Sequence, residues 1–187
     1  MQSHPIIDSC WHRLSLDVDL ALKPQFQTWA ESAPSTELNF GTIDWFPPEE
    51  VFDTEWLKNL DQQWDIRFYR VLLFVRENDS DPGCHVDHGQ YSSAINWCLG
   101  PDLREMLWYS VNPGQPRQQP WWRFDQVTAI DRCAVGNGAV LVRTDQPHSI
   151  SPGTDRRVCV SARLDPPRIS WADTVTKFQD LILPVSI

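Results

Sequence analysis

The chain of 187 residues is long enough to bury one hydrophobic core and short for two, so we expect a single domain covering residues 1–187. Sixteen basic and 25 acidic residues give a net charge of −9, which disfavours a nucleic-acid partner because a phosphate backbone would be repelled. No segment reaches the roughly 20 apolar residues that span a bilayer, and residues 1–20 do not resemble a signal peptide. We therefore expect a cytoplasmic protein without a membrane partner.

The N-terminal residues 1–65 are expected to support the core from outside. Residues 1–46 show weak periodicity, which predicts an irregular or partly helical segment. The sequence Pro-Pro-Glu-Glu at 47–50 is typical of a helix start, and it predicts a helix near 50–64 with Asp53 or Thr54 as an alternative N-cap. The apolar residues of its buried face would be Val51, Trp56, Leu57, Leu60 and Trp64.

Residues 66–165 are expected to form a β core. Residues 66–75 become continuously apolar, as in a buried strand, and stop at a cluster of turn-forming residues, 77–83. Further strands are predicted at 92–99, 105–111, 126–129, 139–144 and 157–164. Short strands at this spacing favour a sandwich or barrel. The tail, 166–187, includes a helix-like segment at 171–181.

The cysteines and tryptophans indicate a packed interior. The five cysteines form no C-x-x-C pair, so we expect reduced thiols, mostly in the core: Cys10, Cys84, Cys98, Cys133 and Cys159. Ten tryptophans suit core packing, and some could line a cleft.

One long loop separates two predicted strands. Residues 110–124 carry three prolines and the pair Trp121 and Trp122, and long loops in compact domains are often functional. We expect this segment to form a flap over a cleft.

The residues that indicate chemistry are His85 and Asp87, which follow the turn, and His148, which follows the apolar run 139–142. In an extended segment residues i and i+2 point the same way, so His85 and Asp87 can reach one metal ion. Two imidazoles and one carboxylate leave coordination positions open on iron(II), as oxygen activation requires. His88 is expected to be a neighbour of this site rather than a ligand.

The pattern resembles the iron(II) and 2-oxoglutarate dependent dioxygenase superfamily, in which H-x-D is followed by a distal histidine and then by a basic residue. Here that basic residue is best matched by Arg157. The resemblance covers about residues 66–165. It implies a mainly β fold, a double-stranded β-helix of the jelly-roll or cupin type with flanking helices. It also implies Fe(II), 2-oxoglutarate as cosubstrate and O2, with His85, Asp87 and His148 as the catalytic metal ligands.

The resemblance assigns Arg157 to the distal carboxylate of the cosubstrate, a task that suits the planar, bidentate guanidinium. Period two places Ser161 and Arg163 on the same face of the strand, so Ser161 could add a hydrogen bond and Arg163 is a rival for the carboxylate. Arg156 should point away. A contact from Asn96 to the cosubstrate is a further expectation.

The expected function is hydroxylation of a free amino acid, an amino-acid-like metabolite or a short peptide held under the flap. Trp121 and Trp122 would meet an apolar portion, and Arg117 or Arg123 a carboxylate. Hydroxylation is favoured over halogenation because Asp87 supplies a carboxylate ligand. Two alternatives stay open, a cosubstrate-independent cupin-type metalloenzyme and a non-enzymatic ligand-binding barrel. The sequence carries no signal for an oligomeric state.

Overall fold

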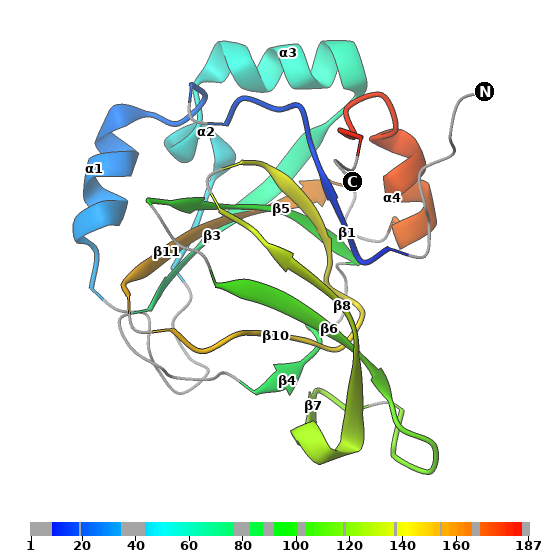
Figure 1. The fold of residues 1–187 in the computed structure, drawn as a ribbon. Helices are drawn as coiled ribbons and strands as arrows, with labels where there is room; N and C mark the ends of the chain where they lie inside the picture. Colours follow the sequence, from blue (N-terminus) through cyan, green and yellow to red (C-terminus); the bar gives the residue numbers. More distant parts are fainter. Residues whose placement is uncertain are drawn as a thin grey trace.

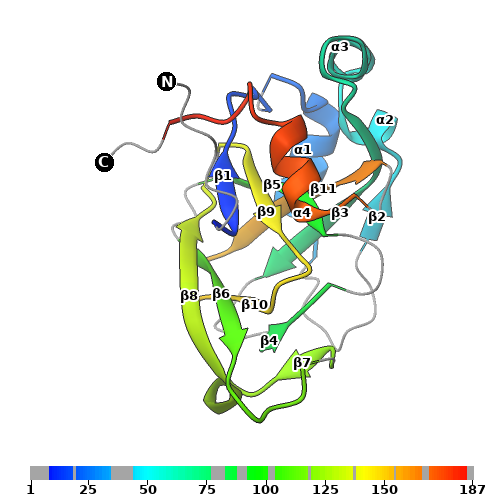
Figure 2. The ribbon, with the colours of Figure 1, turned by 90° about the vertical axis from the view of Figure 1, so that its right-hand side faces the viewer.

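The fold of the described residues is mainly β, as the sequence predicts. A computed structural model describes residues 9–18, 20–34, 44–76, 83–87, 92–100, 104–117, 119–136, 138–153, 155–165 and 169–184. Within these ranges the strands form two antiparallel sheets that face each other, and helices pack outside one of them (Figures 1 and 2).

The larger sheet carries the helices. Its six strands lie in the order β1 (Trp11–Arg13), β9 (Val140–Arg143), β5 (Ser93–Leu99), β11 (Arg157–Asp165), β3 (Arg67–Arg76) and β2 (Asp44–Phe46). The central strand β11 pairs with β3 along its whole length and with β5 along most of it.

The smaller sheet carries the short strands. Its order is β7 (Trp121–Trp122), β4 (Cys84–His85), β10 (His148–Ile150), β6 (Glu105–Val111) and β8 (Val127–Ala134). The sequence did not predict β4, β7 or β10, because two or three residues carry no periodicity of their own. The strand predicted at 126–129 extends to Ala134.

The helices are α1 (Pro24–Ser32), α2 (Pro48–Val51), α3 (Thr54–Trp64) and α4 (Trp171–Lys177), with a 3-10 turn at Phe124–Gln126. The prediction of one continuous helix over 50–64 is wrong, because Phe52 adopts an extended conformation and bridges to Leu22. Asp53 caps α3 by accepting hydrogen bonds from the backbone of Glu55 and Trp56, as one of the two predicted alternatives requires.

The N-terminal segment differs from the prediction in one respect. It includes the predicted helical part, α1, but it also contributes β1 and β2 to the larger sheet. These strands are three residues long and are defined by their pairing with β9 and β3, which no local pattern reveals.

The central strand β11 separates two apolar layers. Val158, Val160 and Ala162 pack in the cluster that includes the helices, whereas Cys159 packs between the sheets. Alternate residues of β11 therefore face the helices and the smaller sheet, and both faces are buried. All five cysteines are buried and free, as expected.

Candidate metal centre

Strand pairing brings the two predicted histidine ligands together. His85 ends β4, His148 begins β10, and the two residues are direct partners in the antiparallel register. Side chains of direct partners lie on the same face of a sheet. The centroids of the two imidazole rings are accordingly 4.5 Å apart.

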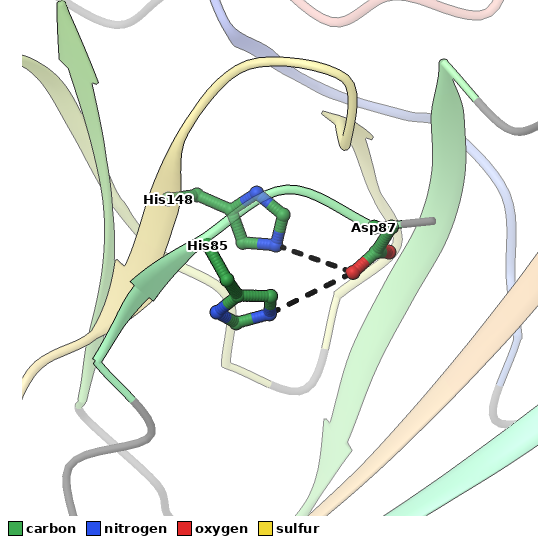
Figure 3. Close-up of side chains that lie close together, drawn as sticks. All are labelled: His85, Asp87 and His148. Atoms are coloured by element: carbon green, nitrogen blue, oxygen red, sulfur yellow. Dashed lines mark ion pairs between the residues drawn. The ribbon is translucent and has the colours of Figure 1, made fainter. Parts of the chain in front are cut away.

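Asp87 completes the cluster from the segment after β4. Its backbone N–H donates to the carbonyl oxygen of Thr144, 3.0 Å away, which fixes the chain at this point. Its Oδ1 lies 3.7 Å from Nε2 of His85 and 3.6 Å from Nε2 of His148 (Figure 3). One ligand atom from each of the three residues lies within 4.8 Å of the other two, so these residues could hold one metal ion.

Both imidazoles are oriented by backbone carbonyls. Nδ1 of His85 lies 3.2 Å from the carbonyl oxygen of Gly83, and Nδ1 of His148 lies 2.9 Å from that of Gln146. A carbonyl only accepts, so these contacts assign the proton of each neutral ring to Nδ1 and leave the lone pair on Nε2. In Figure 3 both Nε2 atoms point toward Asp87. This is the arrangement that metal-ligating histidines require.

The electrostatics keep these groups in the forms that bind metal. Burial, together with the neighbouring His148, lowers the pKa of His85 to about 4. Burial acts to raise the pKa of Asp87, but Arg163 and the two histidines outweigh it and hold the pKa well below the usual range of a carboxyl group. At neutral pH the imidazole of His85 is therefore neutral and the carboxylate of Asp87 is ionised, so neither group has to release a proton when it binds a metal ion.

Arg163 lies against the acid of the cluster. Its Nη1 is 2.6 Å from Oδ2 of Asp87, and the Arg163 side chain is buried. The carboxylate thus turns one oxygen toward the histidines and the other toward the guanidinium. Sequence reasoning found Arg163 but not this contact, because the contact joins β11 to a segment of the other sheet.

The other predicted cosubstrate residues lie along the same inner face. Ser161 and Asn96 are direct partners on β11 and β5, and both are buried. Oγ of Ser161 and Oδ1 of Asn96 have no hydrogen-bond partner in the part of the chain that the structure describes. Arg157 is buried at the start of β11, six positions from Arg163, or about 20 Å along the strand. Arg156 instead donates to the carbonyl oxygen of Ala33 behind α1, so it points away as predicted.

Part of the segment predicted to be a flap packs against the site. Trp121 pairs with His85 through β7, and its indole stacks on the imidazole with ring centroids 4.8 Å apart. The sequence indicated a role for Trp121 only through its position beside Trp122 in the predicted flap. Gly83 is the last residue of the predicted turn and has a φ of 75°, a backbone conformation that favours glycine. It lies beside the side chain of Trp121. His88 and residues 77–82 lie outside the described residues.

A cleft opens next to the cluster. It has a volume of about 710 Å³ and includes Asp87 in its wall. The other lining residues are Val86, Ser110, Val111, Arg117, Gln119, Pro120, Trp122, Asp145, Gln146 and Pro147. Of the two arginines predicted to meet a substrate, only Arg117 lines this cleft.

No protein-family model matches the chain, and no curated protein sequence matches it. Among the described helices, none combines the length and apolar content needed to cross a bilayer.

Proposed function

We propose that this protein is an Fe(II) and 2-oxoglutarate dependent oxygenase that hydroxylates an amino-acid-like metabolite or a peptide. The observation that carries the proposal is the convergence of His85, Asp87 and His148, with both Nε2 atoms and one carboxylate oxygen directed at one point. The chain's resemblance to the H-x-D and distal-histidine pattern supports the same reading.

The donor set fits iron(II) better than a structural metal. Two imidazoles and one carboxylate fill half of an octahedral coordination sphere and leave positions for exogenous ligands. A structural zinc site is instead closed by four ligands, commonly cysteines. No further His, Cys, Asp or Glu belongs to the cluster among the residues that the structure describes.

The strand order supports a double-stranded β-helix. Four strands of the larger sheet follow the order β9, β5, β11 and β3, and four of the smaller follow β4, β10, β6 and β8. Consecutive strands from β3 to β6 and from β8 to β11 alternate between the two sheets, which is the pattern of a chain wound into a jelly roll. In this fold the metal ligands of β4 and β10 would meet at one mouth of the barrel.

The inner face of the larger sheet suits an anionic cosubstrate. Arg157 and Arg163 lie on it, and their direct partners on β3 are Arg76 and Arg70. The resemblance assigns the distal carboxylate of 2-oxoglutarate to Arg157, and Arg163, which contacts Asp87, is its rival nearer the metal ligands. Ser161 and Asn96, between them, offer buried oxygen atoms to the same ligand.

The residues of the chain have separate tasks in this reaction. Bound iron would support the oxidative decarboxylation of 2-oxoglutarate by O2 to succinate and CO2, with the second oxygen atom entering a substrate C–H bond. His85, Asp87 and His148 hold the metal, and Arg163 orients Asp87. Arg157, or its rival Arg163, would bind the cosubstrate through charge-assisted hydrogen bonds, and Trp121 covers one face of His85.

The test is a two-step assay on the purified protein. Iron(II) binding is measured first under anaerobic conditions, and succinate formation from 2-oxoglutarate is then measured after O2 is admitted. We expect one iron per chain and succinate that requires both iron and O2. Iron binding without succinate would favour the cosubstrate-independent metalloenzyme, and absence of metal binding would favour a non-enzymatic barrel.

A further inference from the structure

The cleft beside Asp87 carries one cation that none of the described residues neutralises. Arg117 lines the cleft, is exposed, and forms no ion pair or hydrogen bond with any residue that the structure describes. The two acids of the cleft wall are both engaged. Asp87 contacts Arg163 at 2.6 Å, and Asp145 contacts Nε of Arg143 at 2.6 Å.

Arg123, the other arginine of this segment, provides the contrast. Its guanidinium binds the carboxylate of Asp125 through two hydrogen bonds, of 3.0 and 2.6 Å, and it does not line the cleft. In a protein of net charge −9, an unneutralised arginine in a cleft next to a candidate metal centre favours an anionic ligand.

Part of the cleft wall is apolar and held in place. Val86, Pro120, Trp122 and Pro147 supply apolar surface. Trp122 is buried, and its Nε1 donates to the carbonyl oxygen of Pro116, 3.1 Å away and next to Arg117 in sequence. This bond ties the segment that carries the cation to the apolar wall, so the two surfaces are presented together.

We propose that the cleft binds a primary substrate that combines a carboxylate, recognised by Arg117, with an apolar body that packs on Trp122 and its proline neighbours. The proposal rests on the proposed oxygenase function and names the substrate class of that site. A cleft of about 710 Å³ lies in the size range of sites that bind drug-sized ligands, and it leaves room for more than one free amino acid. The class is therefore an acylated amino acid or an acidic peptide segment, which share this chemistry.

The experiment uses matched acids and amides on the iron-loaded protein without O2, so that binding is measured without turnover. One arm contains N-acetyl-leucine, N-acetyl-phenylalanine and their amides. The other contains Ala-Leu-Glu-Leu-Ala peptides with blocked termini and their glutamine counterparts. Ligand-observed NMR gives the affinities of wild type, Arg117→Gln, Arg117→Lys and the control Arg123→Gln.

We expect wild type and Arg123→Gln to bind the acids of at least one arm about tenfold more tightly than the amides, a modest factor because Arg117 is exposed. Arg117→Gln should lose this preference, and Arg117→Lys should retain part of it. The arm that shows the preference identifies the source of the carboxylate.

The result that overturns the proposal is equal binding of acids and amides, absence of binding by every acid at millimolar concentration, or an acid preference that survives Arg117→Gln. Iron binding, and succinate formation without added substrate after O2 is admitted, are measured on separate portions of the same protein preparations. If these are normal while the acid preference is absent, the substrate inference fails and the oxygenase proposal stands. If iron binding and succinate formation are absent while the preference for acids depends on Arg117, the oxygenase proposal fails. The inference that the cleft binds carboxylate ligands then stands.

Discussion

At the scale of single residues, the orientation of Asp87 depends on one buried contact. Arg163 holds Oδ2 at 2.6 Å and leaves Oδ1 for the histidines. Partners that orient a metal ligand typically contribute a factor of about 10 to 100 in metal affinity. Arg163→Met should therefore weaken iron(II) binding by about this factor in equilibrium dialysis.

The matched control for that change is Arg156→Met. This substitution also removes a guanidinium, but one that contacts the carbonyl oxygen of Ala33 at the end of α1 and not the metal ligands. Arg163→Lys should recover part of the affinity, since the lysine restores the charge. Circular dichroism confirms that each variant is folded. Iron affinity that is unchanged in Arg163→Met would show that Arg163 does not position the ligand.

Arg157 has a separate predicted effect, on the cosubstrate. Removing a charge-assisted contact worth about 1.5–3 kcal/mol should raise the 2-oxoglutarate concentration needed for half-maximal succinate formation by about 10- to 100-fold in Arg157→Ala. Iron binding should stay normal, because Arg157 lies at the far end of β11 from Arg163. An unchanged cosubstrate requirement would redirect the assignment to another arginine of the inner face.

The sequence predicted the three cluster residues but not what surrounds them. His85 and Asp87 are recognisable because their spacing of two places both side chains on one side of an extended segment. The stacking of Trp121 on His85 and the contact of Arg163 with Asp87 join segments that are distant in sequence. Such contacts follow from the pairing of whole strands, so no local pattern contains them.

At the scale of elements, α3 depends on a defined N-cap. The Asp53 carboxylate accepts from the backbone N–H groups of Glu55 and Trp56, at 2.9 and 3.0 Å. Loss of an N-cap costs about 1 kcal/mol. Asp53→Ala should lower the free energy of unfolding by this amount in urea titration.

The control for the cap is Glu55→Ala, which removes an exposed first-turn acid and its ion pair with Lys58 but leaves the cap, and it should change the free energy of unfolding by less than about 0.5 kcal/mol. Equal effects of the two substitutions would mean that the cap contributes nothing beyond surface charge.

The long strands were predictable and the short ones were not. The second half of β3 is largely buried and reads as a continuous apolar run, and β11 is buried along nearly its whole length and contains Val, Cys and Ala. β4 and β10 have two and three residues and exist because they pair with each other and with β7 and β6. The candidate site lies on these short strands. Its ligand residues could be predicted from their spacing, but the strand pairing that brings them together could not.

At the scale of the whole molecule, stability should depend on pH through a buried histidine remote from the candidate metal centre. Burial lowers the pKa of His12, whose ring stacks on Trp171. Below the ordinary pKa of about 6.5 the unfolded chain binds a proton that the folded protein does not bind. His12 therefore contributes a loss of stability as pH falls below this value, by at most about 1.4 kcal/mol per pH unit.

The variant His12→Phe keeps an aromatic ring and removes this titration. Urea denaturation of the metal-free protein at pH 7 and 5.5 should show a smaller loss of stability in His12→Phe than in wild type. An identical pH dependence in both proteins would mean that folding does not change the pKa of His12.

The proposed function depends most on His85, Asp87 and His148, which would hold the iron ion needed for turnover of 2-oxoglutarate. The most direct measurement is iron- and O2-dependent succinate formation by wild type, by His85→Ala, Asp87→Ala and His148→Ala, and by Asp53→Ala as a control far from chemistry. We predict turnover in wild type and Asp53→Ala, and its loss in all three cluster variants, with each variant folded by circular dichroism. Near-normal turnover in any folded cluster variant, or none in wild type loaded with iron, would contradict the account.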